Sequence, residues 1–160
     1  MRTTPFKSVA FLVLAVVLWT AGNWINDFLF YTRTRPTEAA VAGMYVPNTL
    51  TLADMRSRGR YDVSARETSL ILRDDASFEM TDMPDWWRHS SGESWQGFLH
   101  WSGTWSIRQN SPDKTWSLEL AMGQLTTFAD LGNQKPPYAI YFVLGDPDES
   151  RGMTFVRVNE

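Results

Sequence analysis

The feature of this chain that most constrains its fold is a strict alternation of side-chain types over residues 99–108. One alternate set is apolar or small and the other is polar: Leu99, Trp101, Gly103, Trp105 and Ile107 against His100, Ser102, Thr104, Ser106 and Arg108. Successive side chains on a strand point to opposite faces, so a repeat of two predicts a β-strand with one buried face and one wet face. A lone strand is not stable, and the rest of the chain must supply its neighbours.

Several other segments carry the same repeat. Turn residues at 110–114 lead into residues 116–122, which alternate again and are predicted to pair antiparallel with the first strand. A turn-forming stretch at 73–77 lies between two short alternating segments, which predicts a hairpin over residues 70–80. Shorter strands are predicted at three further places, the second of which is apolar on both faces and should be covered on both sides: residues 44–46, 138–144 and 153–158.

One helix is predicted over residues 51–58. It would open with the cap-like pair Thr51-x-x-Asp54 and close at Gly59. About eight short antiparallel strands with this single early helix predict a mainly β protein, in which a meander closes into a small barrel or a strongly curved sheet. A β-sandwich is the alternative architecture.

The N-terminal segment differs from the rest of the chain. Residues 9–21 hold one polar side chain, Thr20, and follow the basic residues Arg2 and Lys7. A cleaved signal peptide and an uncleaved anchor both fit this pattern. Because the apolar character continues as far as Tyr31, the anchor is favoured, and residues 9–31 would span about 34 Å as a helix. The predicted organisation is a membrane anchor at residues 1–31, a linker at 32–42 and a β domain at 43–160.

Three polar side chains interrupt the predicted anchor. Thr20, Asn23 and Asp27 are spaced three and four apart and would form one stripe of the helix. This stripe is interpreted either as a solvated helix end or as a contact with another membrane protein. The basic residues before the apolar run favour a single pass through the cytoplasmic membrane, with the C-terminal domain on the periplasmic or extracellular side.

Composition excludes several classes of function. Residues 1–41 carry four basic and two acidic side chains, a balance of +2, whereas the remainder carries eleven basic and sixteen acidic side chains, a balance of −5. An acidic domain without clustered basic residues is a poor partner for nucleic acid. The chain has no cysteine, which excludes disulfides, thiol catalysis and cysteine-ligated metals.

The polar residues that could carry chemistry form no recognised motif. Asp85, His89 and Glu93 are spaced four apart and His100 follows, a spacing that would suit metal ligands on a helix but equally suits surface polar residues in a loop. The segment 92–97 lacks the spacing and the context of a nucleophile elbow. No cofactor, metal or catalytic residue is therefore assigned. The alternative function is a small envelope hydrolase that uses His89 or His100 with Asp85 or Glu93.

Tryptophan is concentrated in one part of the chain, with six between residues 86 and 116. Trp101, Trp105 and Trp116 lie on the inward set of predicted strands and are interpreted as core. The other three, Trp86, Trp87 and Trp95, fall in a predicted loop. They are candidate ligand-binding residues at the mouth of a barrel.

A family resemblance rests on four short motifs in order along about 115 residues: Gly43-Met44-Tyr45, Asp74-Asp75-Ala76-Ser77-Phe78, Ser102-Gly103-Thr104-Trp105 and Thr154-Phe155-x-Arg157. They resemble the lipocalin-like small β-barrels of exported or membrane-anchored bacterial proteins, with Tyr45 in place of the usual tryptophan. The segments 83–87 and 145–148 are similar to uncharacterised membrane-anchored proteins of this plan. The resemblance implies a barrel with a cavity for an apolar ligand.

Together these observations predict a membrane-tethered, non-enzymatic β domain. It would contact the lipid membrane through residues 9–31. The domain would bind an apolar small molecule, another envelope component or a protein partner.

Overall fold

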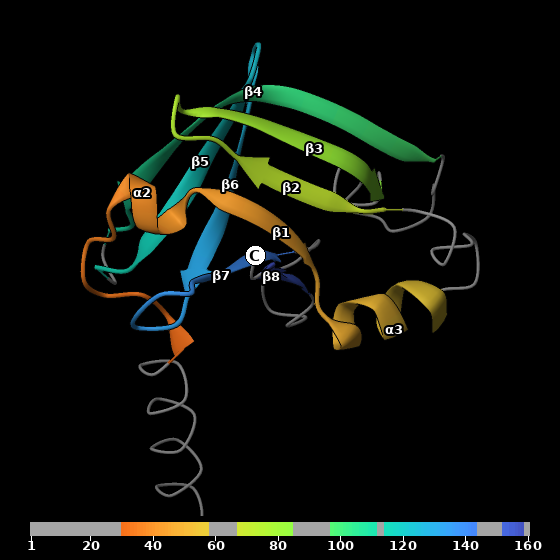
Figure 1. Ribbon diagram of the computed structural model, residues 1–160, viewed down its shortest axis with the longest axis horizontal. Helices are drawn as coiled ribbons and strands as arrows, with labels where there is room; N and C mark the ends of the chain where they lie inside the picture. The colour runs from red at the N-terminus through yellow and green to blue at the C-terminus, as the bar shows by residue number, and fades with distance from the viewer. Residues whose placement is uncertain (1–29, 58–66, 85–96, 112–113, 144–151, 159–160) are drawn as a thin grey trace, which may run out of the picture.

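The computed structural model describes residues 30–57, 67–84, 97–111, 114–143 and 152–158, and within them eight antiparallel strands close into a barrel in chain order (Figure 1). The strands are β1 Gly43–Pro47, β2 Ser69–Leu72, β3 Ser77–Pro84, β4 Phe98–Gln109, β5 Trp116–Met122, β6 Leu125–Gly132, β7 Ala139–Val143 and β8 Gly152–Arg157. β8 pairs with β1 and completes the ring. The predicted mainly β class and barrel are confirmed.

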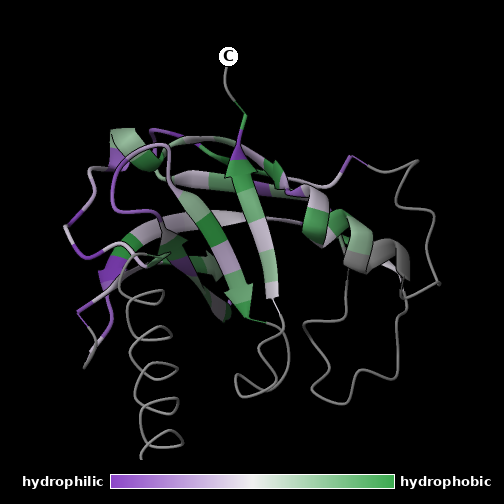
Figure 2. Ribbon diagram, turned by 90° about the horizontal axis from the view of Figure 1, so that it is seen from below, coloured by the Kyte–Doolittle hydropathy of each residue, from purple (hydrophilic) through white to green (hydrophobic). Residues whose placement is uncertain are grey.

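The strand that most constrained the fold forms as predicted. In β4 the polar set of alternate residues is exposed, and the apolar set is buried or half-buried. β4 pairs antiparallel with β5 from Thr104–Ala121 to Gln109–Trp116. The predicted hairpin over residues 70–80 forms between β2 and β3. More and less hydrophobic residues alternate along the strands, as the colours of Figure 2 show.

β6 is the strand that sequence reasoning did not name. It follows β5 through the short turn at Gly123-Gln124, where Gly123 has a φ of +62°. Its inward residues are apolar only in part, and Phe128 lies on the outward face with 49% of its surface exposed. The repeat of two is therefore weak in this strand, and only its pairing with β5 and β7 makes its identity clear.

The barrel interior is filled by large apolar side chains from every strand. The largest fully buried ones are Tyr45, Phe78, Phe142, Phe155, Leu70, Leu72, Met80, Met83, Leu118, Leu120 and Leu131. An eight-stranded barrel is just wide enough for side chains to fill it or for one small ligand. The packing explains how a chain without disulfides is held together.

Helix α3, Thr49–Ser57, follows β1 and begins two residues earlier than predicted. Its first turn is capped by Asn48, whose Oδ1 accepts a hydrogen bond from the Thr51 amide at 2.8 Å. The predicted cap at Thr51 is wrong, because the Thr51 hydroxyl instead accepts a hydrogen bond from the Thr154 amide of β8 at 2.9 Å. This contact fixes the start of α3 against the barrel.

The segment predicted as a linker packs against the barrel. It contains a short helix, α2 Glu38–Val41, in which Val41 is fully buried. Before it, the Thr32 amide donates to the Leu131 carbonyl at 2.8 Å, and the Trp116 amide donates to the Thr32 carbonyl at 2.9 Å. Charge and proline suggested a tether without secondary structure, but α2 forms within it, and buried Thr32 and Val41 hold the segment against the barrel.

Residues 30–42 and the β2–β3, β4–β5 and β6–β7 turns mark one end of the barrel, here called the sealed end. At this end the Tyr45 hydroxyl donates to the Val41 carbonyl at 2.6 Å, and burial raises the pKa of Tyr45 to about 12 although the nearby Arg157 guanidinium acts in the opposite direction. A Cβ on Gly43 would lie 2.7 Å from Arg157 Nε. Two of the motifs that carry the lipocalin resemblance therefore meet here, and the eight-stranded antiparallel barrel is consistent with it.

Among the described residues, no helix is both long and apolar enough to cross a membrane. Most of the predicted anchor, including the stripe Thr20, Asn23 and Asp27, lies outside the described residues.

Candidate functional site

The site begins where β4 and β5 stop pairing with each other. Residues 98–103 of β4 extend past the last β5 pair, Thr104–Ala121, and pair on their other side with β3. The parting point is Gly103, where a Cβ would lie 1.9 Å from the Ala121 carbonyl oxygen. A side chain there would collide with backbone, so glycine allows β5 to end this close to β4.

Strand pairing also ends early between β6 and β7. Their ladder runs from Gly132–Ala139, next to the β6–β7 turn, to Asp130–Tyr141, where it stops. β6 continues from residue 129 back to Leu125 with β5 as its partner, and the end of β7 continues with β8 as its partner. Toward the end of the barrel that holds the β5–β6 hairpin, β6 and β7 therefore have no pair beyond Asp130–Tyr141 within the part of the chain that the structure describes.

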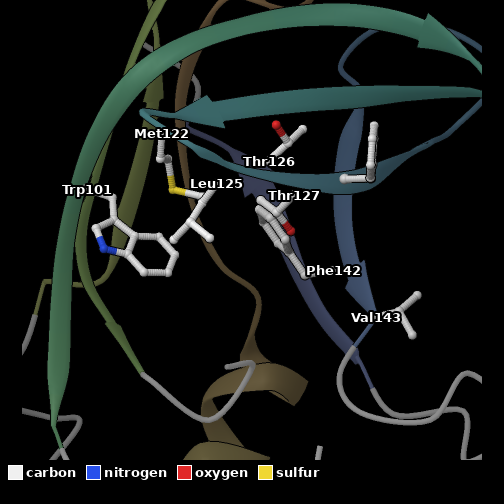
Figure 3. A pocket seen from close by; sticks show the side chains of 8 residues that line it. Trp101, Met122, Leu125, Thr126, Thr127, Phe142 and Val143 are labelled. Atoms are coloured by element: carbon white, nitrogen blue, oxygen red, sulfur yellow. The ribbon is translucent and has the colours of Figure 1, made fainter. Parts of the chain in front are cut away.

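A pocket of about 290 Å³ lies where these partings meet (Figure 3). Its described lining comes from the start of β4, the β5–β6 hairpin and the end of β7: Trp101, Met122, Leu125, Thr126, Thr127, Phe128, Phe142 and Val143. This end of the barrel, opposite the sealed end, is called the pocket end.

The side chains that line the pocket are mostly apolar, with two hydroxyl groups among them. Its eight described residues carry no formal charge, and their only side-chain hydrogen-bonding groups are the indole of Trp101 and the hydroxyls of Thr126 and Thr127. Ligand sites for small molecules are typically apolar hollows with a few polar groups, and about 300 Å³ is the lower end of their usual size. The lining suits a small apolar molecule or one hydrocarbon chain.

The rim of the pocket exposes apolar surface to solvent. Leu125 is 54% exposed, Phe128 49% and Val143 41%. Clustered exposed apolar side chains beside a hollow mark interaction sites more often than isolated ones do. Arg108 contacts the rim residue Phe128: its guanidinium carbon lies 5.6 Å from the Phe128 ring centre, and its Nη1 lies 3.3 Å from the Glu119 carboxylate.

The tryptophans divide differently from the prediction. Trp105 is buried and its Nε1 donates to the Arg73 carbonyl at 2.9 Å, as expected for a core residue. Trp116 is half-buried at the sealed end, where its Nε1 donates to the Arg33 carbonyl at 3.2 Å. Trp101, predicted as core, packs on the core and also lines the pocket. Trp101 lies near the start of β4, before the first β4–β5 pair at Thr104–Ala121. This position is the sequence signal that could have separated Trp101 from the core tryptophan.

The other predicted ligand-binding residues, Trp86, Trp87 and Trp95, lie outside the described residues. The prediction that they line a mouth stays a prediction.

The residues of the alternative hydrolase are only partly described. Asp85, His89 and Glu93 lie outside the described residues. His100 is on the exposed face of β4, and its Nε2 lies 3.3 Å from Asp82 Oδ1, a partner that sequence reasoning did not consider. Asp82 occupies a bulge of β3 with a φ of +48°, which turns it toward β4.

Among the described residues, no three side chains of the metal-ligating types gather closely enough to hold an ion. Comparison of the chain with protein-family models, with curated proteins and with solved structures finds no match. Among the described residues, the pocket is therefore the feature that points to a function.

Proposed function

We propose that this protein is a membrane-tethered, non-enzymatic binding module that takes up a small apolar ligand in the pocket at the pocket end of the barrel. The observation that carries the proposal is the contrast within one barrel: its interior is filled with large side chains, yet about 290 Å³ stays open beside Trp101 and Phe142. Exposed apolar residues surround this opening. A folding core alone does not require them.

The proposed location is the outer side of the cytoplasmic membrane. The apolar run over residues 9–31 and the resemblance to exported or membrane-anchored bacterial barrels support it. In that location the ligand would be a component of the envelope, or an apolar molecule that passes through it. Another membrane protein is the proposed partner of the stripe Thr20, Asn23 and Asp27.

Photo-crosslinking of the full chain in phosphatidylcholine nanodiscs tests the binding site. The probe is a twelve-carbon alcohol with a diazirine at the end of its chain, and mass spectrometry locates the adducts. The expected result is labelling that saturates with probe concentration in the peptides that contain Trp101 and Met122. Absence of saturable labelling in this part of the barrel would overturn the proposal.

A pair of matched variants separates pocket binding from attachment to the surface. Thr127→Leu adds bulk inside the pocket, where the probe would then be overpacked at a cost of roughly 1–3 kcal/mol of binding free energy. Labelling should therefore weaken about tenfold. Thr104→Leu makes the same change on the exposed face of β4, outside the pocket lining, and should leave labelling unchanged. Equal effects of the two variants would also contradict the proposal.

A further inference from the structure

The first described residues, 30–32, are part of the barrel wall at the sealed end. Tyr31 forms a β-bridge with Gly132, and the Asn133 amide donates to the Phe30 carbonyl at 2.6 Å. Figure 1 shows this start of the described chain, in orange, against the turn between β6 and β7. No spacer therefore separates residue 30 from the barrel.

The ring of Phe30 strengthens this connection. It meets the Tyr141 ring edge-on with the ring centres 6.0 Å apart, and a Cβ on Gly132 would lie 3.3 Å from its Cζ atom. The proposed anchor, residues 9–31, ends at this contact. A helix that crosses a bilayer places its terminal aromatic residues at the level of the lipid head groups. The β6–β7 turn, which hydrogen-bonds the end of the anchor, would then lie at the same level.

The two segments that meet here are basic, although the domain as a whole is acidic. Residues 30–37 and 133–138 contain no acidic side chain and three cations, Arg33, Arg35 and Lys135. Arg35 and Lys135 are exposed, and the Arg35 guanidinium carbon lies 5.7 Å from the ring centre of Trp116. Stacking on an aromatic ring orients a guanidinium and leaves its N–H groups able to donate to phosphate oxygens. Basic residues beside a membrane segment are attracted to anionic lipids.

We propose that the sealed end docks on the bilayer that residues 9–31 cross, where Arg33, Arg35 and Lys135 bind the phosphates of anionic lipid head groups. The proposal rests on the membrane tether of the proposed function, and it adds a lipid-binding surface and an orientation of the barrel. With the sealed end on the membrane, the pocket end faces away from it. A ligand of the pocket would therefore arrive from the aqueous side.

Spin labels in the full chain test the orientation. The chain has no cysteine, so one introduced cysteine carries a nitroxide at a chosen position. Thr34→Cys labels the exposed position between the two arginines, and Gln124→Cys labels the exposed β5–β6 turn at the pocket end. The chain is placed in nanodiscs of equal parts phosphatidylcholine and phosphatidylglycerol with a trace of a gadolinium-chelating lipid, which speeds the relaxation of nearby nitroxides.

The label at residue 34 should relax several times faster than the label at residue 124. Equal relaxation of the two labels would mean that the barrel has no fixed orientation on the membrane. Faster relaxation at residue 124 would mean that the pocket end faces the bilayer. Either result would overturn the proposal.

Charge variants of the chain labelled at residue 34 test the head-group contact. Arg35→Gln and Lys135→Gln should each lower the equilibrium constant for docking about fivefold, the effect of one basic residue at an anionic membrane surface. The matched pair Arg35→Lys and Lys135→Arg keeps the charge and should leave the relaxation unchanged. High salt, or nanodiscs of phosphatidylcholine alone, should slow the relaxation of the label in the parent chain as well.

Fast relaxation at residue 34 that persists in phosphatidylcholine alone and in the neutral variants would overturn head-group binding, because the contacts of residues 30–32 would then orient the barrel without it. Absence of the full chain from the nanodisc fraction would overturn the membrane tether, and this proposal with it. Labelling of the pocket by the apolar probe is a separate measurement, so the pocket and the docking surface can fail independently.

Discussion

The two ends of this barrel use the same strands in opposite ways. At the sealed end residues 30–42 cross the strand ends, and their polar groups meet backbone partners, as in the Asn133 amide that donates to the Phe30 carbonyl at 2.6 Å. Gln134 hydrogen-bonds the Tyr31 carbonyl beside it. At the pocket end the ladders stop early, and apolar side chains remain exposed. The difference indicates that stability is concentrated at the sealed end, and the proposed ligand contact lies at the other end.

The contrast is visible along a single strand. In β5, Leu120 is fully buried, and Met122, two residues further toward the pocket end, is half-buried and lines the pocket. Both side chains belong to the same inward set and differ only in how far they lie from the end of the barrel. They offer the strongest test of the comparison.

Leu120→Ala is expected to cost roughly 2–5 kcal/mol of unfolding free energy, because it leaves a cavity in packed core. Met122→Ala should cost about 1 kcal/mol or less, because it enlarges a hollow that already exists. Denaturant unfolding of the full chain, followed by tryptophan fluorescence, measures both. Similar losses for the two variants would mean that the pocket end is packed like the rest of the barrel, and the comparison would fail.

How far this division could be predicted from the sequence depends on the residue. The alternation over residues 99–108 identified β4, its buried face and its pairing with β5. It could not distinguish Trp101 from Trp105, which occupy the same face four residues apart. Only the end of the β5 ladder, between Thr104 and Gly103, places one of them at a pocket and the other in the core.

β6 is a second place where the sequence alone does not predict the structure. Its Thr126-Thr127-Phe128 segment has polar residues on both faces and an apolar residue facing outward, because the strand borders a hollow on one side and solvent on the other. A repeat of two arises from a dry face and a wet face, and it weakens where both faces are partly wet. The alternation is lost in β6 because the pocket leaves both faces of the strand partly exposed.

The sealed end should respond to pH through Tyr45. Its pKa is raised to about 12 mainly by burial, so the neutral phenol is favoured in the folded state. The unfolded chain ionises near pH 10, and stability contributed by the neutral form is therefore present below pH 10 and is lost as pH rises to 12. The loss amounts to about 2 kcal/mol.

Tyr45→Phe isolates this effect. At pH 8 the variant should be about 1 kcal/mol less stable, because the 2.6 Å hydrogen bond to the Val41 carbonyl is lost. Toward pH 12 the difference should close and then reverse to about 1 kcal/mol in favour of the variant, since phenylalanine does not ionise and only the wild type loses about 2 kcal/mol. Unfolding at a series of pH values measures the difference between the two proteins, which removes the contributions of other titrating groups. A constant difference from pH 8 to pH 12 would show that Tyr45 is not held in a dry site.

The smallest expected effect lies on the surface of the sealed end. Arg73 Nη2 and Glu79 Oε2 form an ion pair at 2.7 Å, but 44% and 48% of the two side chains are exposed. Glu79→Gln should therefore cost less than about 0.5 kcal/mol of unfolding free energy. This cost should shrink further in about 0.5 M salt, where the Debye length falls to roughly 4 Å and exposed charges are screened from each other. Buried Thr32, whose hydroxyl donates to the Asn133 carbonyl at 2.5 Å, supplies the matched case.

Thr32→Val removes that hydroxyl with little change of shape and should cost about 1 kcal/mol at any salt concentration. If both variants lose the same free energy and both respond to salt, charge on the surface holds the sealed end together. If Thr32→Val alone is costly and insensitive to salt, buried hydrogen bonds hold it. The second result is expected, because water competes for the exposed ion pair and does not reach Thr32.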